Sequence, residues 1–281
     1  MKFTKMHGAG NDYIYVNGFE EHLADPAATA IKVSDRHFGI GADGLIVILP
    51  SDVADFRMAM YNADGSEGKM CGNATRCIGR YVYDNGLTNK TEVTLETLSG
   101  VKIIQIHTDE NGAFQSATVN MGAPILSPPE IPALFDGTLA VDVPLEVEGK
   151  IWRVTAVSMG NPHCVTFMKE SPAGLDLPRI APAFESHKAF PERVNTEFCK
   201  VRSSTLLEMR VWERGSGETL ACGTGACATA VAAILQGYCA KDKDITLRLR
   251  GGDLAIRWTS ADGFVYKTGP AEFICTGEIA V

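Results

Sequence analysis

Two cysteines stand at matching places in the two halves of the chain. Cys71 and Cys222 are each followed by glycine, and each has a glutamate four positions before it. A segment with helical spacing follows each glycine, so each thiol is expected at the N-terminus of a helix. The unpaired backbone N–H groups and the dipole at such an end favour an anion and lower the pKa of a thiol below its free value of about 8.5. The pattern therefore predicts acid–base catalysis by thiols.

A pair of such thiols fits the inversion of a carbon stereocentre. Removing the proton from the α-carbon of an amino acid leaves a planar carbanion, and inversion requires that a second group return a proton to the opposite face. The N–H groups at two helix starts would also bind the substrate carboxylate as charge accumulates on it. We interpret Cys71 and Cys222 as the two acid/base groups of a racemase or epimerase.

Other functions for the cysteines are less consistent with their spacing. The chain has eight cysteines but no C-x-x-C motif, which disfavours a zinc ribbon and a thioredoxin-type redox site. Cys77 and Cys227 lie five or six positions after the candidate pair, a spacing that suits no common zinc site, and both fall inside the expected helices. We expect these two thiols in the core, and no metal site. A non-catalytic binding domain would not need both members of the pair.

A second motif indicates that the chain contains a duplication. Asn11 ends the sequence HGAGN and precedes Cys71 by 60 residues, and Asn161 ends SMGN and precedes Cys222 by 61. Matched motifs at matched spacing predict two similar domains. We assign residues 1–121 with 266–281 to an N-terminal domain and 122–265 to a C-terminal domain, with the active site in the cleft between them.

Local patterns supply the elements that must position the cysteines. Two helices are expected, from Gly72 to Asn85-Gly86 and from Gly223 to Gln236-Gly237, where glycine can take the left-handed conformation that ends a helix. Runs rich in β-branched and aromatic residues predict strands at 3–6, 14–16, 45–49, 101–106, 152–157, 164–168, 206–212, 245–249 and 254–258. The segment GIGADG at 39–44 matches a dinucleotide-binding fingerprint, but it precedes a strand instead of following one, so nucleotide binding is not expected.

Composition excludes several classes of partner. The 281 residues carry a net charge of -8 with a pI near 5.3, which argues against nucleic-acid binding. The longest uncharged stretch, 219–240, is interrupted by glycines and is expected to be a buried helix instead of a membrane span. The N-terminal residues contain no apolar leader. We expect a cytoplasmic enzyme that acts on a small molecule.

Several motifs together resemble the diaminopimelate epimerase family. They occur in order along nearly the whole chain: HGAGND at 7–12, NADGSE at 62–67 leading into CGN at 71–73, SMGNPHCV at 158–165, ERG at 213–215 and ACGTGAC at 221–227. The resemblance implies an α/β (α+β) fold of two pseudo-symmetric domains, each a curved mixed sheet wrapped around a central helix. It also implies interconversion of LL- and meso-2,6-diaminopimelate, in lysine and peptidoglycan precursor biosynthesis, by a homodimer that uses neither pyridoxal phosphate nor a metal.

The resemblance also implies roles for individual residues. Cys71 and Cys222 would be the proton donor and acceptor, and the remaining positions would bind the substrate or modulate the thiols. The reacting carboxylate would be bound by the backbones of Gly72, Asn73, Gly223 and Thr224, the reacting end by Asn11, and the distal amino-acid end by Asn62, Asn161, Asn195 and Arg214. His163 and Glu213 would adjust the pKa of the cysteines, and Glu213 would also contact substrate.

One departure concerns substrate contacts. Many family members carry glutamine where this chain has Gly44, so one side-chain contact near the ligand is missing or is made by another group. Ala74-Thr75 likewise replaces a more familiar glycine-containing pair, a change that backbone donors would survive. The alternative is therefore a pyridoxal-phosphate-independent racemase of another amino acid. The distal asparagines and the planar guanidinium of Arg214 favour a substrate with a second amino-acid head.

Overall fold

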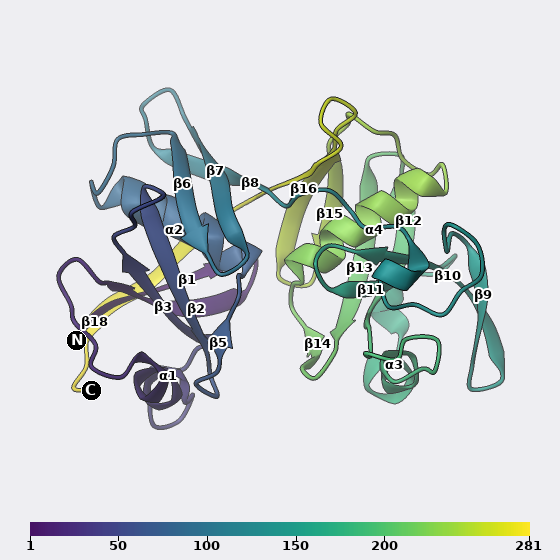
Figure 1. The fold of residues 1–281 in the computed structure, drawn as a ribbon, viewed down its shortest axis with the longest axis horizontal. Coiled ribbons are helices and arrows are strands. Elements are labelled where there is room, and N and C mark those ends of the chain that lie inside the picture. Colours follow the sequence, from purple (N-terminus) through teal and green to yellow (C-terminus); the bar gives the residue numbers. More distant parts are fainter. The chain divides into compact units, whose positions relative to one another are not determined.

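The computed structural model describes residues 1–281. The chain divides into two compact units, one formed by residues 1–120 and 268–281 and the other by residues 121–267. Each unit combines a mixed β-sheet with two α-helices (Figure 1). The α/β class predicted from the sequence is confirmed.

The first unit is built on one twisted run of paired strands, in the order β18-β1-β2-β3-β4-β6-β7-β8. Only β2–β3 and β4–β6 pair in parallel, and the short β5 extends along β4. The bounds are β1 Lys2–Gly8, β2 Asn11–Asn17, β3 Gly44–Leu49, β4 Phe56–Asn62, β5 Glu67–Gly68, β6 Glu92–Thr97, β7 Gly100–Thr108, β8 Phe114–Asn120 and β18 Glu272–Glu278.

The second unit repeats this plan in the order β9-β10-β11-β12-β13-β15-β16, with the short β14 along β13. Again only two pairs, β11–β12 and β13–β15, are parallel. The bounds are β9 Val143–Val147, β10 Lys150–Ser158, β11 Pro162–Phe167, β12 Asn195–Ser203, β13 Leu206–Glu213, β14 Gly217–Thr219, β15 Ile245–Leu249, β16 Gly252–Trp258 and β17 Val265–Gly269. Strand β17 carries the chain back into the first unit.

The order of helices completes the repeat. A short helix connects the first parallel pair in each unit, and a longer helix follows the short strand β5 or β14. The bounds are α1 Pro26–Ser34, α2 Gly72–Asp84, α3 Leu177–Glu185 and α4 Gly223–Leu235, with single 3-10 turns at Pro128–Glu130 and Pro172–Gly174. The pairings from β18–β1 to β6–β7 in the first unit have counterparts from β9–β10 to β15–β16 in the second, as the predicted duplication requires.

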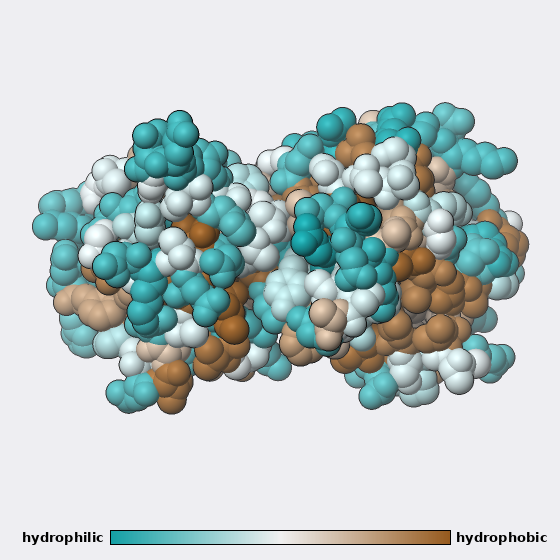
Figure 2. All heavy atoms as spheres, turned by 90° about the horizontal axis from the view of Figure 1, so that it is seen from above, coloured by the Kyte–Doolittle hydropathy of each residue, from teal (hydrophilic) through white to brown (hydrophobic).

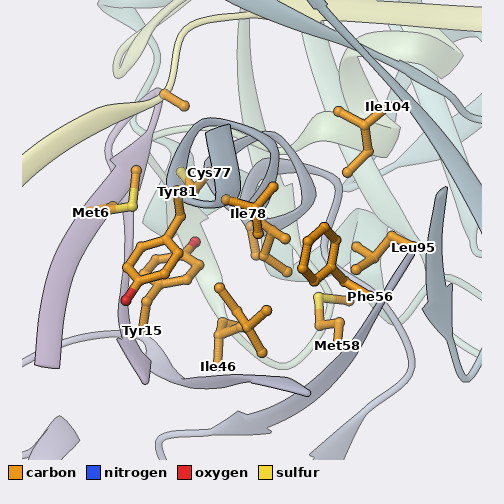
Figure 3. Packing of buried hydrophobic residues seen from close by; sticks show 14 of the residues in the cluster. Met6, Tyr15, Ile46, Phe56, Met58, Cys77, Ile78, Tyr81, Leu95 and Ile104 are labelled. Carbon is orange, nitrogen blue, oxygen red and sulfur yellow. The ribbon is translucent and has the colours of Figure 1, made fainter. Parts of the chain in front are cut away.

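Helix α2 lies inside the curve of its own sheet, where it packs against β1, β2, β7 and β8. Ile78, Tyr81 and Val82 are buried, as their helical spacing predicts. Figure 3 shows Ile78 among side chains from the strands, with Phe56 and Leu95 near it. The helix ends where Gly86 takes a φ of 69°, in agreement with the predicted stop.

Helix α4 occupies the equivalent place in the second unit, where it packs against β10, β11, β12 and β16. Every residue from Gly225 to Ala233 is buried, which accounts for a helix that is apolar on all sides. Gly237 follows the helix with a φ of 75°. The stretch that raised the membrane question in the sequence is therefore the core helix of this unit.

Two helices, α1 and α3, were absent from the sequence prediction. Nine strands were absent as well, namely β4, β5, β6, β8, β9, β12, β14, β17 and β18. Signals for α1 were present, since Asp25 caps it by accepting a hydrogen bond from the Ala28 N–H (2.9 Å) and Pro26 is its first residue. Helix α3 contains Pro182 in its interior, a residue that normally argues against a helix. Both helices are only nine residues long, so neither develops the periodicity on which the prediction depended.

In the view of Figure 2, most of the surface is hydrophilic or of intermediate hydropathy, and hydrophobic side chains gather in a patch on one of the two units. None of the helices has both the length and the apolar character needed to span a bilayer.

A partly buried ion-pair cluster fixes the start of β2. The Asp12 carboxylate lies 2.9 Å from the Lys5 ammonium on β1 and 2.9 Å from the Arg36 guanidinium after α1. Burial raises the pKa of Asp12, but the hydrogen bonds and charges of Arg36 and Lys5 outweigh it and hold the pKa below its ordinary value of 3.8. The ionised carboxylate therefore ties three elements together.

Replacing Asp12 with asparagine is expected to lower the free energy of unfolding by roughly 1–3 kcal/mol at neutral pH, the scale of hydrogen bonds to charged groups. Because the pKa of Asp12 is depressed in the folded state, its contribution is complete above pH 3.8 and is lost as the pH falls through the lowered value. Denaturant titrations between pH 7 and about 2 should show the gap between wild type and variant closing in acid. Asp52→Asn, at an exposed bend between β3 and β4, is the control. A gap that stays constant with pH would contradict this role for Asp12.

Candidate functional site

Cys71 occupies the N-cap position of α2, as the sequence predicted. Its backbone is extended (φ −126°, ψ 117°), and the helix begins at Gly72. Strand β5, which pairs with β4, precedes this N-cap in the chain. The Cys71 thiol donates a hydrogen bond to the side-chain oxygen of Asn11 (3.3 Å), which lies 60 residues earlier in the sequence. The two residues that define the repeat in the first half are therefore in direct contact.

The orientation of the Asn11 amide follows from its other partner. Its nitrogen donates to the Asp43 carboxylate (2.7 Å), which can only accept, so its oxygen faces Cys71. Asp43 is itself held by Arg36 (3.0 Å). Asn73, the second residue of α2, also directs its side-chain nitrogen to the Asn11 oxygen (3.5 Å). Asn11, Cys71 and Asn73 thus form one cluster at the start of the helix.

A buried arginine, Arg76, holds the side chain of Asn73 in place. The Arg76 guanidinium is fully buried and donates to the Asn73 side-chain oxygen (3.1 Å) and to the Gly72 carbonyl (3.2 Å). Asn62 lies at the end of β4, where its side-chain nitrogen donates to the Ser66 hydroxyl (2.9 Å) in a tight turn. Its binding role stays a prediction.

Cys222 occupies the same position on α4. Its backbone is again extended (φ −114°, ψ 112°), and helix α4 begins at Gly223. The Cys222 sulfur accepts a hydrogen bond from the Gly225 N–H (3.4 Å) and lies 3.4 Å from the Thr224 hydroxyl. A side chain at position 225 would collide with Glu197, since a Cβ there would lie 2.5 Å from a carboxylate oxygen. Glycine is required here so that the carboxylate can lie against the first turn.

The protonation of Cys222 differs from the sequence expectation. A helix start was expected to lower the pKa of this thiol, but burial raises it well above the ordinary value, and the charges of Glu213 and Glu197 raise it further. The hydrogen bonds from Thr224 and Gly225 act in the opposite direction and do not compensate. In this environment Cys222 is held as a thiol, because a buried thiolate near the carboxyl groups of Glu213 and Glu197 would be unfavourable.

His163 and Glu197 form a buried pair behind this helix start. His163 Nδ1 lies 2.7 Å from the Glu197 carboxylate, and both side chains are fully buried. His163 Nε2 lies 3.1 Å from the side-chain oxygen of Asn161, so one imidazole links two residues of the site. Burial raises the pKa of Glu197, His163 lowers it, and Glu213 raises it.

Glu197 was not among the residues singled out from the sequence. Its strand begins with the letters NTEFC, and a glutamate within an apolar run is the one signal that could have identified it. The parallel register of β11 and β12 pairs His163 with Asn195, which places Glu197 two residues further along the same strand. That register depends on tertiary pairing and is not visible in the sequence.

Asn195 acts mainly as a structural tie. Its nitrogen donates to the Pro162 carbonyl (2.8 Å), and its oxygen accepts from the backbone N–H of Arg214 (3.0 Å). The Arg214 guanidinium donates to the Glu192 carbonyl (2.9 Å). Glu213 accepts from the Thr219 hydroxyl (2.6 Å) across the β13–β14 hairpin. Asn195 therefore positions the backbone that carries Arg214 and Glu213.

Two surface hollows lie elsewhere. One, of about 320 Å³, is bordered by β1, β18 and Tyr81, and the other, of about 220 Å³, by β9, β10 and α3. Neither hollow is lined by a candidate site residue from the sequence. The two helix starts, in contrast, carry Cys71 and Cys222 with their hydrogen-bond partners. We therefore take each helix start as a candidate site in its own unit.

The comparisons with known proteins agree with these motifs. The family model described as diaminopimelate epimerase matches residues 3–127 and 155–274. The diaminopimelate epimerase of Desulfovibrio desulfuricans is 55% identical over 284 residues, covering 99% of this chain and 98% of its own. That of Agathobacter rectalis is 52% identical over 288 residues and covers both chains completely.

The chain belongs to the diaminopimelate epimerase family.

Membership confirms the resemblance predicted from the motifs. Solved structures of low sequence identity share the fold of this chain. A phenazine biosynthesis protein of the PhzF family from Bacillus anthracis has a TM-score of 0.73 at 16% identity and covers 100% of this chain and 99% of its own. A hydroxyproline epimerase from Agrobacterium vitis has a TM-score of 0.68 at 15% identity, with 99% and 90% covered. At such identities the likeness concerns the fold alone.

Glu213→Gln is expected to lower the pKa of Cys222, because it removes one of the two negative charges that raise it. The midpoint of Cys222 alkylation by iodoacetamide against pH, followed by peptide mapping, should move down by about one unit. Glu218→Gln is the matched control on the same hairpin, since its charge is already balanced by Arg210 and Arg250. An unchanged or higher midpoint in the Glu213 variant would refute this electrostatic assignment.

Proposed function

We propose that this chain interconverts LL- and meso-2,6-diaminopimelate, with Cys71 and Cys222 as the two acid/base groups at one α-carbon. The observation that carries the proposal is the duplicated helix start: each cysteine is an N-cap with extended backbone, followed by glycine at the first helical position. Relatives about half identical over the whole chain carry the diaminopimelate epimerase name, which supplies the substrate. The reaction is an isomerisation.

The proton balance follows from the environments of the thiols. Cys222 begins as a thiol because burial and two carboxyl groups raise its pKa. In one direction, the Cys71 thiolate removes the α-proton and becomes a thiol, while Cys222 gives its proton to the opposite face and becomes a thiolate. The reverse direction exchanges these roles. One proton is lost and one gained, so no cofactor enters the balance.

The helix starts would stabilise the intermediate as well as bind substrate. Charge that leaves the α-carbon is shared with the α-carboxylate, and the unpaired N–H groups of Gly72 and Asn73, with those of Gly223 and Thr224, are the donors we assign to it. Donors directed at developing charge contribute typically about 3–4 kcal/mol each to lowering a barrier.

Recognition of the distal end is assigned to Asn62, Asn161, Asn195 and Arg214. One N–H group of Arg214 donates to the Glu192 carbonyl. The remaining N–H groups of its planar guanidinium suit a carboxylate in a bidentate arrangement. Asn195 holds the Arg214 backbone in place. A second amino-acid head, which diaminopimelate has and a monoamino acid lacks, would match this set.

We also propose a homodimer that works in the cytoplasm. The exposed side chains of Phe273 and Ile274 on β18 provide apolar surface suited to a second copy of the chain. Biosynthesis of lysine and of peptidoglycan precursors is the pathway context that the substrate implies.

The decisive experiment supplies LL-diaminopimelate to the purified protein in deuterated water and follows the α-carbon by NMR. Wild type should form meso product with deuterium at the inverted carbon. Cys71→Ala and Cys222→Ala should each lose epimerisation by roughly 100- to 10,000-fold, the usual contribution of a general acid or base. Each should retain one-sided elimination from a halogenated substrate analogue, because one base survives.

Cys275→Ala is the matched control, because Cys275 is an exposed thiol on β18. It should leave the rate unchanged. Near wild-type turnover by either alanine variant of the pair, or turnover of a monoamino acid in preference to diaminopimelate, would overturn the assignment.

A further inference from the structure

Asn11 and Asn161 occupy equivalent places in the repeat, but different groups anchor their side chains. The Asn11 nitrogen donates to the Asp43 carboxylate (2.7 Å), and its oxygen faces the Cys71 thiol. In the second unit, the Asn161 oxygen lies 3.1 Å from His163 Nε2. A carboxylate only accepts hydrogen bonds, so it holds an amide by the nitrogen, whereas a ring N–H holds it by the oxygen. The two asparagines are therefore anchored by opposite ends of the amide.

The imidazole of His163 faces an oxygen atom at each of its ring nitrogens. Nδ1 lies 2.7 Å from Glu197 Oε1, and Nε2 faces the Asn161 oxygen. Both contacts are hydrogen bonds only if the His163–Glu197 pair holds one proton more than a neutral imidazole beside a carboxylate. The proton count is the same whether an imidazolium faces a carboxylate or an imidazole faces a carboxylic acid. In both arrangements Nε2 bears a hydrogen and donates it to Asn161.

The surroundings of Glu197 favour this additional proton. Both side chains of the pair are fully buried, and Glu197 Oε2 has no hydrogen-bond partner. A carboxylate with an unpaired oxygen is unfavourable away from water. Burial accordingly raises the pKa of Glu197 above its ordinary value of 4.5, His163 lowers it without cancelling the rise, and the charge of Glu213 adds to it. The pair therefore retains the proton that Nε2 needs.

The fold confines the Glu197 carboxyl group between the imidazole and a helix start. The parallel register of β11 and β12 pairs Val165 with Glu197, two residues after His163 on the neighbouring strand. On its other side, Glu197 Oε1 lies against the first turn of α4, where a Cβ on Gly225 would come within 2.5 Å of it. A carboxyl group enclosed in this way fixes the position of the ring to which it is bonded.

The far side of the Asn161 amide is available to a ligand. Asn161 is only partly buried, and its side-chain nitrogen makes no hydrogen bond within the protein. We propose that Glu197 is a positioning residue that acts through His163 to hold the Asn161 oxygen, so that the Asn161 nitrogen is presented as a donor to a carboxylate oxygen of the substrate. The three residues lie in the second unit, and only the identity of that carboxylate rests on the proposed function.

The hydrogen on His163 Nε2 is measured directly by NMR of protein labelled with nitrogen-15 histidine, without substrate. Through-bond correlation to the backbone distinguishes His163 from the other five of the six histidines. At neutral pH, Nε2 should carry a hydrogen that exchanges slowly with water, because the ring is buried and bonded to Asn161. A ring that carries its only hydrogen on Nδ1 would overturn the proposal.

Glu197→Leu tests the contribution of the carboxyl group. Leucine has a similar volume and suits a buried strand position, but it cannot bond His163 Nδ1. The slowly exchanging Nε2–H signal should disappear, and KM for LL-diaminopimelate should rise roughly tenfold, as expected when a group that holds a binding residue is lost. Glu208→Leu is the matched control on the neighbouring β13, because its carboxylate bonds Ser171 and Arg202 instead. An unchanged Nε2–H signal and KM in Glu197→Leu would contradict the role of Glu197.

Asn161→Asp tests which amide atom faces the substrate. It keeps an oxygen for His163 and replaces the outward N–H group with an oxygen that repels a carboxylate. KM for LL-diaminopimelate should rise at least about tenfold with little change in kcat, the pattern of lost binding. Asn111→Asp adds the same charge at an exposed turn between β7 and β8 and is the control.

An unchanged or lower KM in Asn161→Asp would mean that the asparagine presents its oxygen to the substrate, which is the opposite of the proposal. The NMR measurement needs no substrate. A hydrogen on His163 Nε2 that depends on Glu197, in a protein that does not turn over diaminopimelate, would therefore support the positioning role while refuting the proposed function.

Discussion

The structure depends on one arrangement that occurs twice: a cysteine with extended backbone at the N-cap of a helix enclosed by its own sheet. The short strands β5 and β14 bring the chain to that point, and glycine at the first helical position follows. Helices α2 and α4 are anchored by buried side chains over most of their length. Their first turns are therefore rigid platforms, and a group placed there is preorganised for chemistry at a developing anion.

The two platforms share a backbone but differ in electrostatics. The Cys71 thiol bonds the side-chain oxygen of Asn11, whereas Cys222 lies in the field of the Glu213 and Glu197 carboxyl groups. The duplicated fold thus provides two equivalent positions while the side chains around the two thiols differ. An acid and a base are needed at the start of each turnover, so this asymmetry is useful in a reaction that inverts a carbon.

The sequence was sufficient to locate the platforms because their signals are local. Single-sequence patterns show the helix starts and ends, the Cys-Gly pairs and the spacing to Asn11 and Asn161. Strand register is not visible in the sequence. It is the register that places Glu197 beside His163 and leaves no room for a side chain at Gly44. The pKa of Cys222 was expected to be lowered, but burial raises it, and the charges of Glu213 on β13 and Glu197 on β12 raise it further.

The central claim is that both sulfurs reach one α-carbon, and oxidation tests it most directly. Such sulfurs lie within a few ångströms once substrate leaves, so mild oxidant should link Cys71 to Cys222 when the Cα atoms approach to within ~7 Å. Peptide mapping should find this bond, activity should fall with it and return with dithiothreitol, and bound substrate should protect. Other cysteine pairs linked while Cys71 and Cys222 stay free would contradict a shared site.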